Sequence, residues 1–216
     1  NNTSLFSWSA QGPTLSLGDC DSDGNDDLWV GSSYDHVNWE TNQLASDSET
    51  YLFKGNGDGT FDDISLESGL KLYNSTILSA SWIDYDNDGD LDIYYSKNGY
   101  SDIESGVQYS NVLFQNNGDC QFTDVTETTG LGNYGLSSTS TWSDYDNDGD
   151  LDLYSMNMGF IDQEYDRLTS QSDIFYKNQL IETGRAFFTD HTQEAGNIFG
   201  SNYWPEEQNA VVFGET

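Results

Sequence analysis

The sequence predicts an all-β protein made of four-stranded antiparallel blades of the β-propeller type, three of them complete and a fourth represented by its first strand. Two observations support this prediction. A nine-residue acidic loop, Asp-x-Asp-x-Asp-Gly-x-x-Asp, begins at Asp19, Asp84 and Asp144. A second motif follows each loop, and the pair recurs at intervals of 65 and then 60 residues. A repeat of this length with short apolar runs is typical of propeller blades.

Each repeat is expected to hold four short strands, because runs of β-branched and aromatic residues alternate with Gly, Asn and Asp turns. The first strand enters the acidic loop and the second leaves it. Asn56-Gly57 and Asn117-Gly118 indicate hairpin turns between the third and fourth strands. No helical periodicity is evident, so helices should be few. The expected strands are 14–17, 28–31, 51–54 and 60–64; 79–83, 91–95, 112–115 and 121–125; and 139–143, 151–155, 174–177 and 187–190.

The whole chain, 1–216, is expected to form one repeat array with units at approximately 14–70, 79–131 and 139–196. A partial unit is expected at 210–216, because residues 210–213 align with the first strand of the earlier units. A lone apolar strand exposes backbone groups that can pair with another strand. Either further blades of the natural polypeptide or another subunit would supply those partners, so the array is expected to be part of a larger propeller or assembly.

The acidic loops predict calcium binding. Carboxylates at positions 1, 3, 5 and 9 repel one another unless a cation lies between them. Ca²⁺ takes six to eight oxygen ligands, and the Gly at position 6 permits the sharp turn that directs the odd-numbered side chains inward. Position 7 would contribute its backbone carbonyl. The expected ligands of three Ca²⁺ are Asp19, Asp21, Asp23, Asn25 (carbonyl) and Asp27; Asp84, Asp86, Asp88, Asp90 (carbonyl) and Asp92; and Asp144, Asp146, Asp148, Asp150 (carbonyl) and Asp152.

An EF-hand begins with the same loop, but it closes its site with Glu at position 12 and has a helix on each side. Position 12 is occupied by Val30, Tyr95 and Ser155. The flanking residues predict strands. The sequence therefore excludes an EF-hand in all three repeats.

Composition narrows the choice of partners. The chain has 216 residues, 38 of them acidic and 6 basic, with a formal net charge of −32, so nucleic acid is excluded as a partner. No apolar run approaches the ~20 residues that cross a bilayer, so direct membrane insertion is not expected. The connections at 32–49, 96–110 and 157–172 carry aromatic residues. These residues either form a recognition surface for a protein or glycan ligand or pack over the ends of the blades.

The cysteines and the glycosylation sequons indicate in which cellular compartment the protein resides. In a propeller, Cys20 and Cys120 would lie in turns on the same face of neighbouring blades, where they either form a disulfide or remain two free thiols. Glycosylation sequons occur at Asn1, Asn2 and Asn74. Together with low-affinity calcium loops and an acidic surface, these features favour an extracellular setting, secreted or at the cell surface.

The loop DYDNDGDLDLY (144–154) and the motif NVLFQNNGDCQFTDVT (111–126) resemble the FG-GAP/VCBS repeat family, which includes the integrin α-subunit propeller. The resemblance is greatest to the cartilage acidic protein and ASPIC/UnbV-type group, and it covers roughly residues 14–196. It implies propeller blades and Ca²⁺ loops. Family propellers have about seven blades, so three units cannot close a ring by themselves. The repeats occur in adhesion proteins, in matrix proteins and as appendages of enzymes.

The sequence predicts a non-catalytic module for adhesion, matrix or ligand binding. No Gly-x-Ser-x-Gly elbow occurs, and most paired carboxylates are better explained as calcium ligands. An alternative is a structural subunit that joins copies of itself through open blade edges into a filament or surface layer. A less favoured alternative is an appendage of a secreted carbohydrate-active enzyme. The only candidates for a glycosidase pair are Glu40, Glu49, Glu104 and Glu164.

Overall fold

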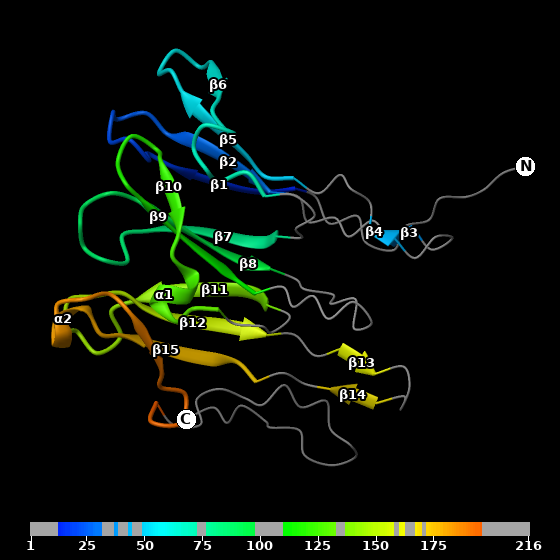
Figure 1. Cartoon of the computed structure of the whole chain (residues 1–216), viewed down its shortest axis with the longest axis vertical. Coiled ribbons are helices and arrows are strands. Elements are labelled where there is room, and N and C mark those ends of the chain that lie inside the picture. The colour runs from blue at the N-terminus through cyan, green and yellow to red at the C-terminus, as the bar shows by residue number, and fades with distance from the viewer. Residues whose placement is uncertain are drawn as a thin grey trace, which may run out of the picture.

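The computed structural model describes residues 13–31, 37–38, 43–44, 49–72, 77–97, 110–132, 137–157, 160–162, 167–169 and 172–195. These residues form three four-stranded antiparallel sheets, stacked as an open array (Figure 1). The predicted fold class is confirmed. The expected partial unit at 210–216 and the sequons at Asn1, Asn2 and Asn74 lie outside the described residues.

Each sheet is a meander in which every strand pairs with the next long strand of the chain, because short turns join them. The first sheet comprises β1 (Thr14–Gly18), β2 (Asp27–Gly31), β5 (Tyr51–Gly55) and β6 (Phe61–Asp63). The second comprises β7 (Ile77–Ile83), β8 (Asp92–Lys97), β9 (Val112–Asn116) and β10 (Phe122–Asp124). The third comprises β11 (Ser137–Ser143), β12 (Asp152–Asn157), β15 (Ile174–Asn178) and β16 (Phe188–Asp190).

The structure departs from the expected elements in three places. The second strand of each unit begins at the last Asp of the loop, one residue from the expected start, and the fourth strands are shorter than expected. The connections at 32–49 and 157–172, where no strand was predicted, each contain a small hairpin: β3 (Val37–Asn38) with β4 (Gln43–Leu44), and β13 (Phe160–Asp162) with β14 (Arg167–Thr169). The described residues contain two helices, α1 (Thr126–Thr129) and α2 (Leu180–Thr183), of four residues each.

The middle sheet is apolar on both faces, because a sheet packs against each of them. Side chains alternate between the two faces of a strand, and all six residues of β8 are buried. Tyr95 faces the first sheet and packs on Trp29, with ring centroids 4.7 Å apart. Tyr94 faces the third sheet and packs edge-on against Trp142 at 5.4 Å. The core is therefore two separate layers, one on each side of the middle sheet.

A glycine sets the closest approach of the first two sheets. Gly18 ends β1 and is buried against the indole of Trp82 on β7. A β-carbon built on Gly18 would lie 2.7 Å from the Trp82 ring, nearer than real contacts allow. A residue without a side chain is therefore required where the two innermost strands meet.

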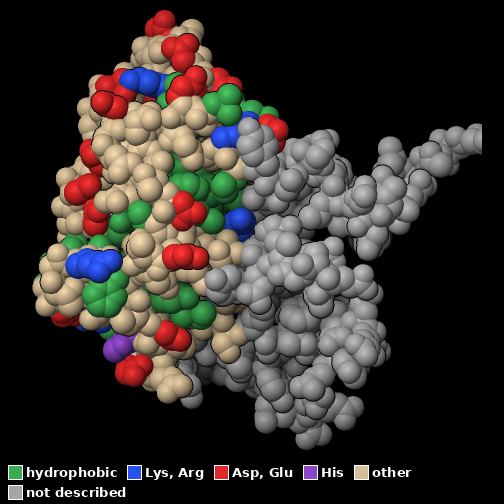
Figure 2. Space-filling view, viewed as in Figure 1, with side chains coloured by type: hydrophobic (Ala, Val, Ile, Leu, Met, Phe, Trp, Pro, Cys, Tyr) green, Lys and Arg blue, Asp and Glu red, His purple; other side chains and the backbone are tan. Residues whose placement is uncertain are grey.

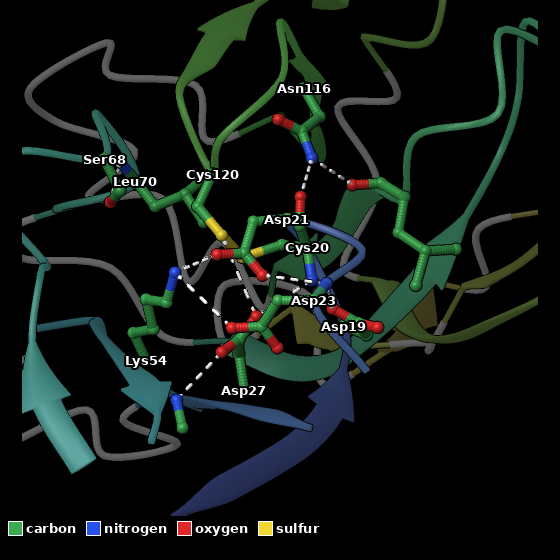
Figure 3. The surroundings of a disulfide bond; sticks show 12 residues. Asp19, Cys20, Asp21, Asp23, Asp27, Lys54, Ser68, Leu70, Asn116 and Cys120 are labelled. Atoms are coloured by element: carbon green, nitrogen blue, oxygen red, sulfur yellow. Dashed lines mark hydrogen bonds and ion pairs between the residues drawn. A yellow bond between two sulfur atoms is a disulfide. The ribbon is translucent and has the colours of Figure 1, made fainter. Parts of the chain in front are cut away.

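A disulfide joins the first two sheets at the end that carries the acidic loops, close to Gly18. Cys20 of the first acidic loop is bonded to Cys120 of the β9–β10 turn, 100 positions further along the chain (Figure 3). Both side chains are buried. Because it closes a long segment of chain, this bond restricts the unfolded state strongly. The pairing is the first of the two outcomes that the sequence left open.

On the face shown in Figure 2, acidic side chains are scattered over the described residues and outnumber the basic ones. None of the helices in the described part of the chain has the length and apolar character needed to span a bilayer.

We expect Gly18→Ala to lower the free energy of unfolding by about 1–3 kcal/mol, because the added methyl group forces Trp82 or the backbone to move. Urea unfolding followed by tryptophan fluorescence measures the change. Gly132→Ala is the matched control, since its β-carbon would meet its nearest neighbour at an ordinary 3.8 Å. Equal stability of both variants would contradict the packing argument.

Replacing Cys20 and Cys120 together by Ser should destabilise the protein by roughly 2–4 kcal/mol, because the unfolded chain regains the entropy that the bond removes. Thermal unfolding with and without a reducing agent measures this. The reductant should lower the midpoint of the wild type and leave that of the double variant unchanged. Recovery of both cysteines as alkylated thiols from the unreduced protein would show that the bond does not form.

Candidate metal centres in three acidic loops

The three acidic loops have the same backbone turn. They are called here the first loop (19–27), the second loop (84–92) and the third loop (144–152), each joining two strands of one sheet. In the first loop Ser22 at position 4 and Gly24 at position 6 have positive φ angles of 57° and 89°. The turn brings the backbone N–H groups of Asp23 and Gly24 onto the Asp19 carboxylate, at 3.0 and 2.9 Å. The corresponding turns in the other loops involve Asn87, Gly89, Asn147 and Gly149.

The aspartate at position 9 fastens each loop to its sheet. Asp27 is fully buried, and its carboxylate accepts hydrogen bonds from the backbone N–H of Cys20 in the loop and of Gly55 at the end of β5, both at 2.9 Å (Figure 3). One side chain thus fixes the start of the loop and the third strand together. The equivalent bonds are Tyr85 N and Asn116 N to Asp92 (3.2 and 2.8 Å), and Tyr145 N and Asn178 N to Asp152 (3.3 and 2.9 Å).

Carboxylates at positions 1, 3 and 9 converge in every loop. One oxygen from each of the three lies within 4.8 Å of the others. The position 5 carboxylates, predicted as ligands, are not part of these three groups. Each accepts the backbone N–H of position 7, for example Asn25 N–H to Asp23 at 2.8 Å. The three groups are Asp19, Asp21 and Asp27; Asp84, Asp86 and Asp92; and Asp144, Asp146 and Asp152.

A further acidic group appears beside the third loop. Asp148 and Asp150 of the loop lie with Glu182 of α2, again with one oxygen from each within 4.8 Å. Asp150 is 1% exposed, and its Oδ1 accepts no hydrogen bond from any described residue. Its Oδ2 accepts the backbone N–H of Ile181 at 3.0 Å. The helix α2 is present only in the third repeat, so this group has no counterpart among the described residues of the other two loops.

The electrostatics of these groups favour a cation. Burial raises the pKa of the Asp92 carboxyl to about 8 and that of Asp152 to about 6, and neighbouring carboxylates add to the effect. Burial also raises the pKa of Asp27. These shifts mean that the negative charge is poorly solvated where the loop carboxylates meet. A divalent cation at that point would stabilise the ionised forms, and ligands that are all carboxylate oxygens suit a hard ion such as Ca²⁺.

Sequence reasoning missed the residues that the third strand places over each loop. Lys54, Gln115 and Lys177 occupy the same position in β5, β9 and β15, and each contacts the position 3 carboxylate of its own loop. The sequence signal was present, because the strands end in the aligned triplets FKG, FQN and YKN. Their partners lie about 30 residues earlier in the chain, however, where a motif read by local spacing does not reach.

An asparagine at the end of the third strand connects consecutive loops. The Asn116 side-chain amide donates to the carbonyl of Cys20 in the first loop at 2.7 Å and to that of Leu91 in its own loop at 3.1 Å (Figure 3). Asn178 does the same for Tyr85 and Leu151, at 2.9 and 3.2 Å. The three loops therefore form one hydrogen-bonded series along one end of the stacked sheets.

Of the four candidates for a glycosidase pair, the structure describes one, Glu49. The Glu49 carboxylate forms an ion pair with the ammonium of Lys71 at 2.7 Å and accepts a hydrogen bond from the hydroxyl of Tyr51 at 2.8 Å. These contacts give Glu49 a structural role. The other three candidates, Glu40, Glu104 and Glu164, lie outside the described residues. A cavity of about 340 Å³ lies beside the second loop, between the second and third repeats, and Asp86, Gln115 and Arg185 are among its lining residues.

Comparison with known proteins agrees with this geometry. The family model of the FG-GAP-like repeat matches residues 19–95 and 95–155. Among curated proteins, none matches the sequence significantly. Repeats of this family form propeller blades, often bind Ca²⁺, and generally serve as non-catalytic modules that contact proteins or other ligands. Because the two matches together cover more than half of the residues, the chain belongs to the FG-GAP-like repeat family.

Proposed function

We propose that the chain is an extracellular calcium-binding module of the β-propeller type, non-catalytic, that serves adhesion, matrix assembly or ligand binding. The observation that supports this most directly is the recurrence of one carboxylate group, from positions 1, 3 and 9, at the same end of all three sheets. Each loop would hold one Ca²⁺ through these carboxylates, with the position 5 carboxylate and the position 7 carbonyl completing the ligands predicted from the sequence.

The calcium ion would have a structural task. In its absence each loop places several carboxylates around one buried aspartate, and their repulsion opposes the folded loop. A bound ion reverses the sign of that contribution, so metal binding and folding are coupled. Since the loops, the hydrogen-bonded asparagines and the disulfide all lie at one end of the sheets, the ions would set the spacing of neighbouring blades.

An extracellular location is supported by the disulfide and by the kind of site. Disulfides persist in oxidising compartments, and acidic calcium loops of this kind suit the millimolar calcium found outside cells. We further propose that residues 1–216 are one repeat array within a larger propeller or assembly. The cavity between the second and third repeats, with Asp86, Gln115 and Arg185 among its lining residues, is a suitable place for a polar protein or glycan group.

A second candidate function is that of a structural subunit joined to other blades, and the outward face of the first sheet favours it. Leu15 and Leu17 of β1 are 60% and 59% exposed. They share a face with Leu28 and Phe53, because Leu17 pairs with Leu28 and Leu28 with Phe53 across the sheet. The equivalent face of the second sheet packs against the first sheet. The outward face therefore has the composition of an interface between blades, and another blade would cover it.

Calorimetric titration of the chelator-treated protein with Ca²⁺ should give a stoichiometry of three, and Asp86→Asn should reduce it to two, because one carboxylate ligand of the second loop is lost. Thermal stability should rise with free Ca²⁺, as expected when only the folded state binds the ion. Asp62→Asn is the matched control, since it removes the same charge from an exposed strand. A stoichiometry of zero or one would refute the proposal.

If the outward face of the first sheet docks a second copy of the chain, sedimentation velocity should show mass increasing with protein concentration. Leu17→Asp should then abolish the increase, because a charge is placed in the contact. Leu66→Asp is the control, as Leu66 is 71% exposed outside the strands of that face. A wild type that stays monomeric at all concentrations would rule out self-assembly through this face.

A further inference from the structure

The residue that each third strand places over its acidic loop differs in charge between the repeats. Lys54 forms ion pairs with the carboxylates of Asp21 and, at 3.6 Å, Asp23 (Figure 3). Lys177 pairs with Asp146 and, at 3.3 Å, with Asp148. These lysines are fixed by the pairing of β5 and β15 with the second strand of their sheets. The first and third loops thus contain a cation supplied by the protein itself.

The second loop has a neutral group at this position. The Gln115 amide donates to Asp86 Oδ2 at 2.6 Å, so the carboxylate is hydrogen-bonded without being neutralised. The chain offers no compensating lysine there, because Asp86 has no ion pair among the described residues. The position 3 carboxylate is therefore approached by a full positive charge in the first and third loops and by an uncharged amide in the second loop.

A lysine ammonium that is paired with a ligand carboxylate opposes the binding of a metal ion in two ways. The ammonium and the ion compete for the same oxygen atoms, and they repel each other once both are present. In the metal-free protein the ammonium has the opposite effect, since it offsets the mutual repulsion of the loop carboxylates. A glutamine does neither. Lys177 is a weaker case than Lys54, because Glu182 accepts a hydrogen bond from its ammonium at 2.7 Å and offsets part of its charge.

We propose that the residue at this position of the third strand sets how strongly each loop binds Ca²⁺ and how far its fold depends on the ion. Lys54 and Lys177 lower the calcium affinity of the first and third loops and hold them closed without metal. Gln115 leaves the second loop with higher affinity and with a fold that needs the ion. This inference rests on the calcium binding proposed above, and it concerns the effect of one side chain within its own loop.

The test exchanges the two residue types and observes each loop separately. Every loop carries its own reporter, since the backbone N–H of Gly24, Gly89 and Gly149 donates to the position 1 carboxylate. Their ¹H–¹⁵N resonances, followed in chelator-buffered Ca²⁺, give one midpoint per loop. Lys54→Gln should shift the Gly24 midpoint to roughly tenfold lower Ca²⁺, and Gln115→Lys should shift the Gly89 midpoint to roughly tenfold higher Ca²⁺. Both shifts should shrink in high salt, because the lysine positions are partly exposed.

Two controls make the result decisive. Lys71→Gln removes the same charge from a lysine that pairs with Glu49 away from the loops, and it should leave all three midpoints unchanged. Lys177→Gln provides a second charge removal that does not depend on the folding of Gln115→Lys, with a smaller shift expected at Gly149. Midpoints unchanged within twofold in both Lys→Gln variants would overturn the inference and leave calcium binding intact. Absence of any Ca²⁺-dependent change at the three glycines would overturn the proposed function, and the inference with it.

Discussion

The buried aspartate at the end of each acidic loop is the constraint on which the rest of the structure depends. It begins the second strand, closes the loop through the backbone N–H of position 2, and holds the end of the third strand through another N–H. A carboxylate with that many backbone partners cannot be replaced by an apolar residue without leaving the donors unpaired. Its burial also places negative charge where water is excluded. Together with the other loop carboxylates it creates a poorly solvated negative region that a bound cation would stabilise.

Neighbouring sheets are joined by apolar contacts between their faces and by polar or covalent links at the end that carries the acidic loops. Between the faces lie aromatic pairs such as Trp29 with Tyr95, which exclude water and bury apolar area. At the loop end lie polar links, the amide of Asn116 and the disulfide, which fix one loop against the next. The apolar layers provide most of the driving force for stacking, and the polar links determine the register of one sheet against its neighbour.

Much of the fold could be predicted from the sequence, because repeated motifs report on local structure. The loops, the order of strands and the turn at Gly24 all follow from spacing and residue type within about ten residues. What the sequence did not show depends on contacts between distant segments. The amide of Asn116 reaches a carbonyl 96 residues away, and Lys54 meets a carboxylate 33 residues away. The group around Glu182 escaped notice because α2 replaces a turn in one repeat only.

The packing of the middle sheet bears on how such an array evolves. The contacts Gly18 with Trp82, Trp29 with Tyr95 and Tyr94 with Trp142 each join one repeat to the next. Selection for close packing therefore acts on pairs that straddle a boundary, and the two members of a pair occupy different positions of the repeat. A substitution on one side of such a contact keeps the packing only if the facing residue of the neighbouring repeat fits it, so the interface between two repeats is the unit that has to be preserved. Duplicating a single repeat preserves the array only where both of its faces meet surfaces already fitted to them.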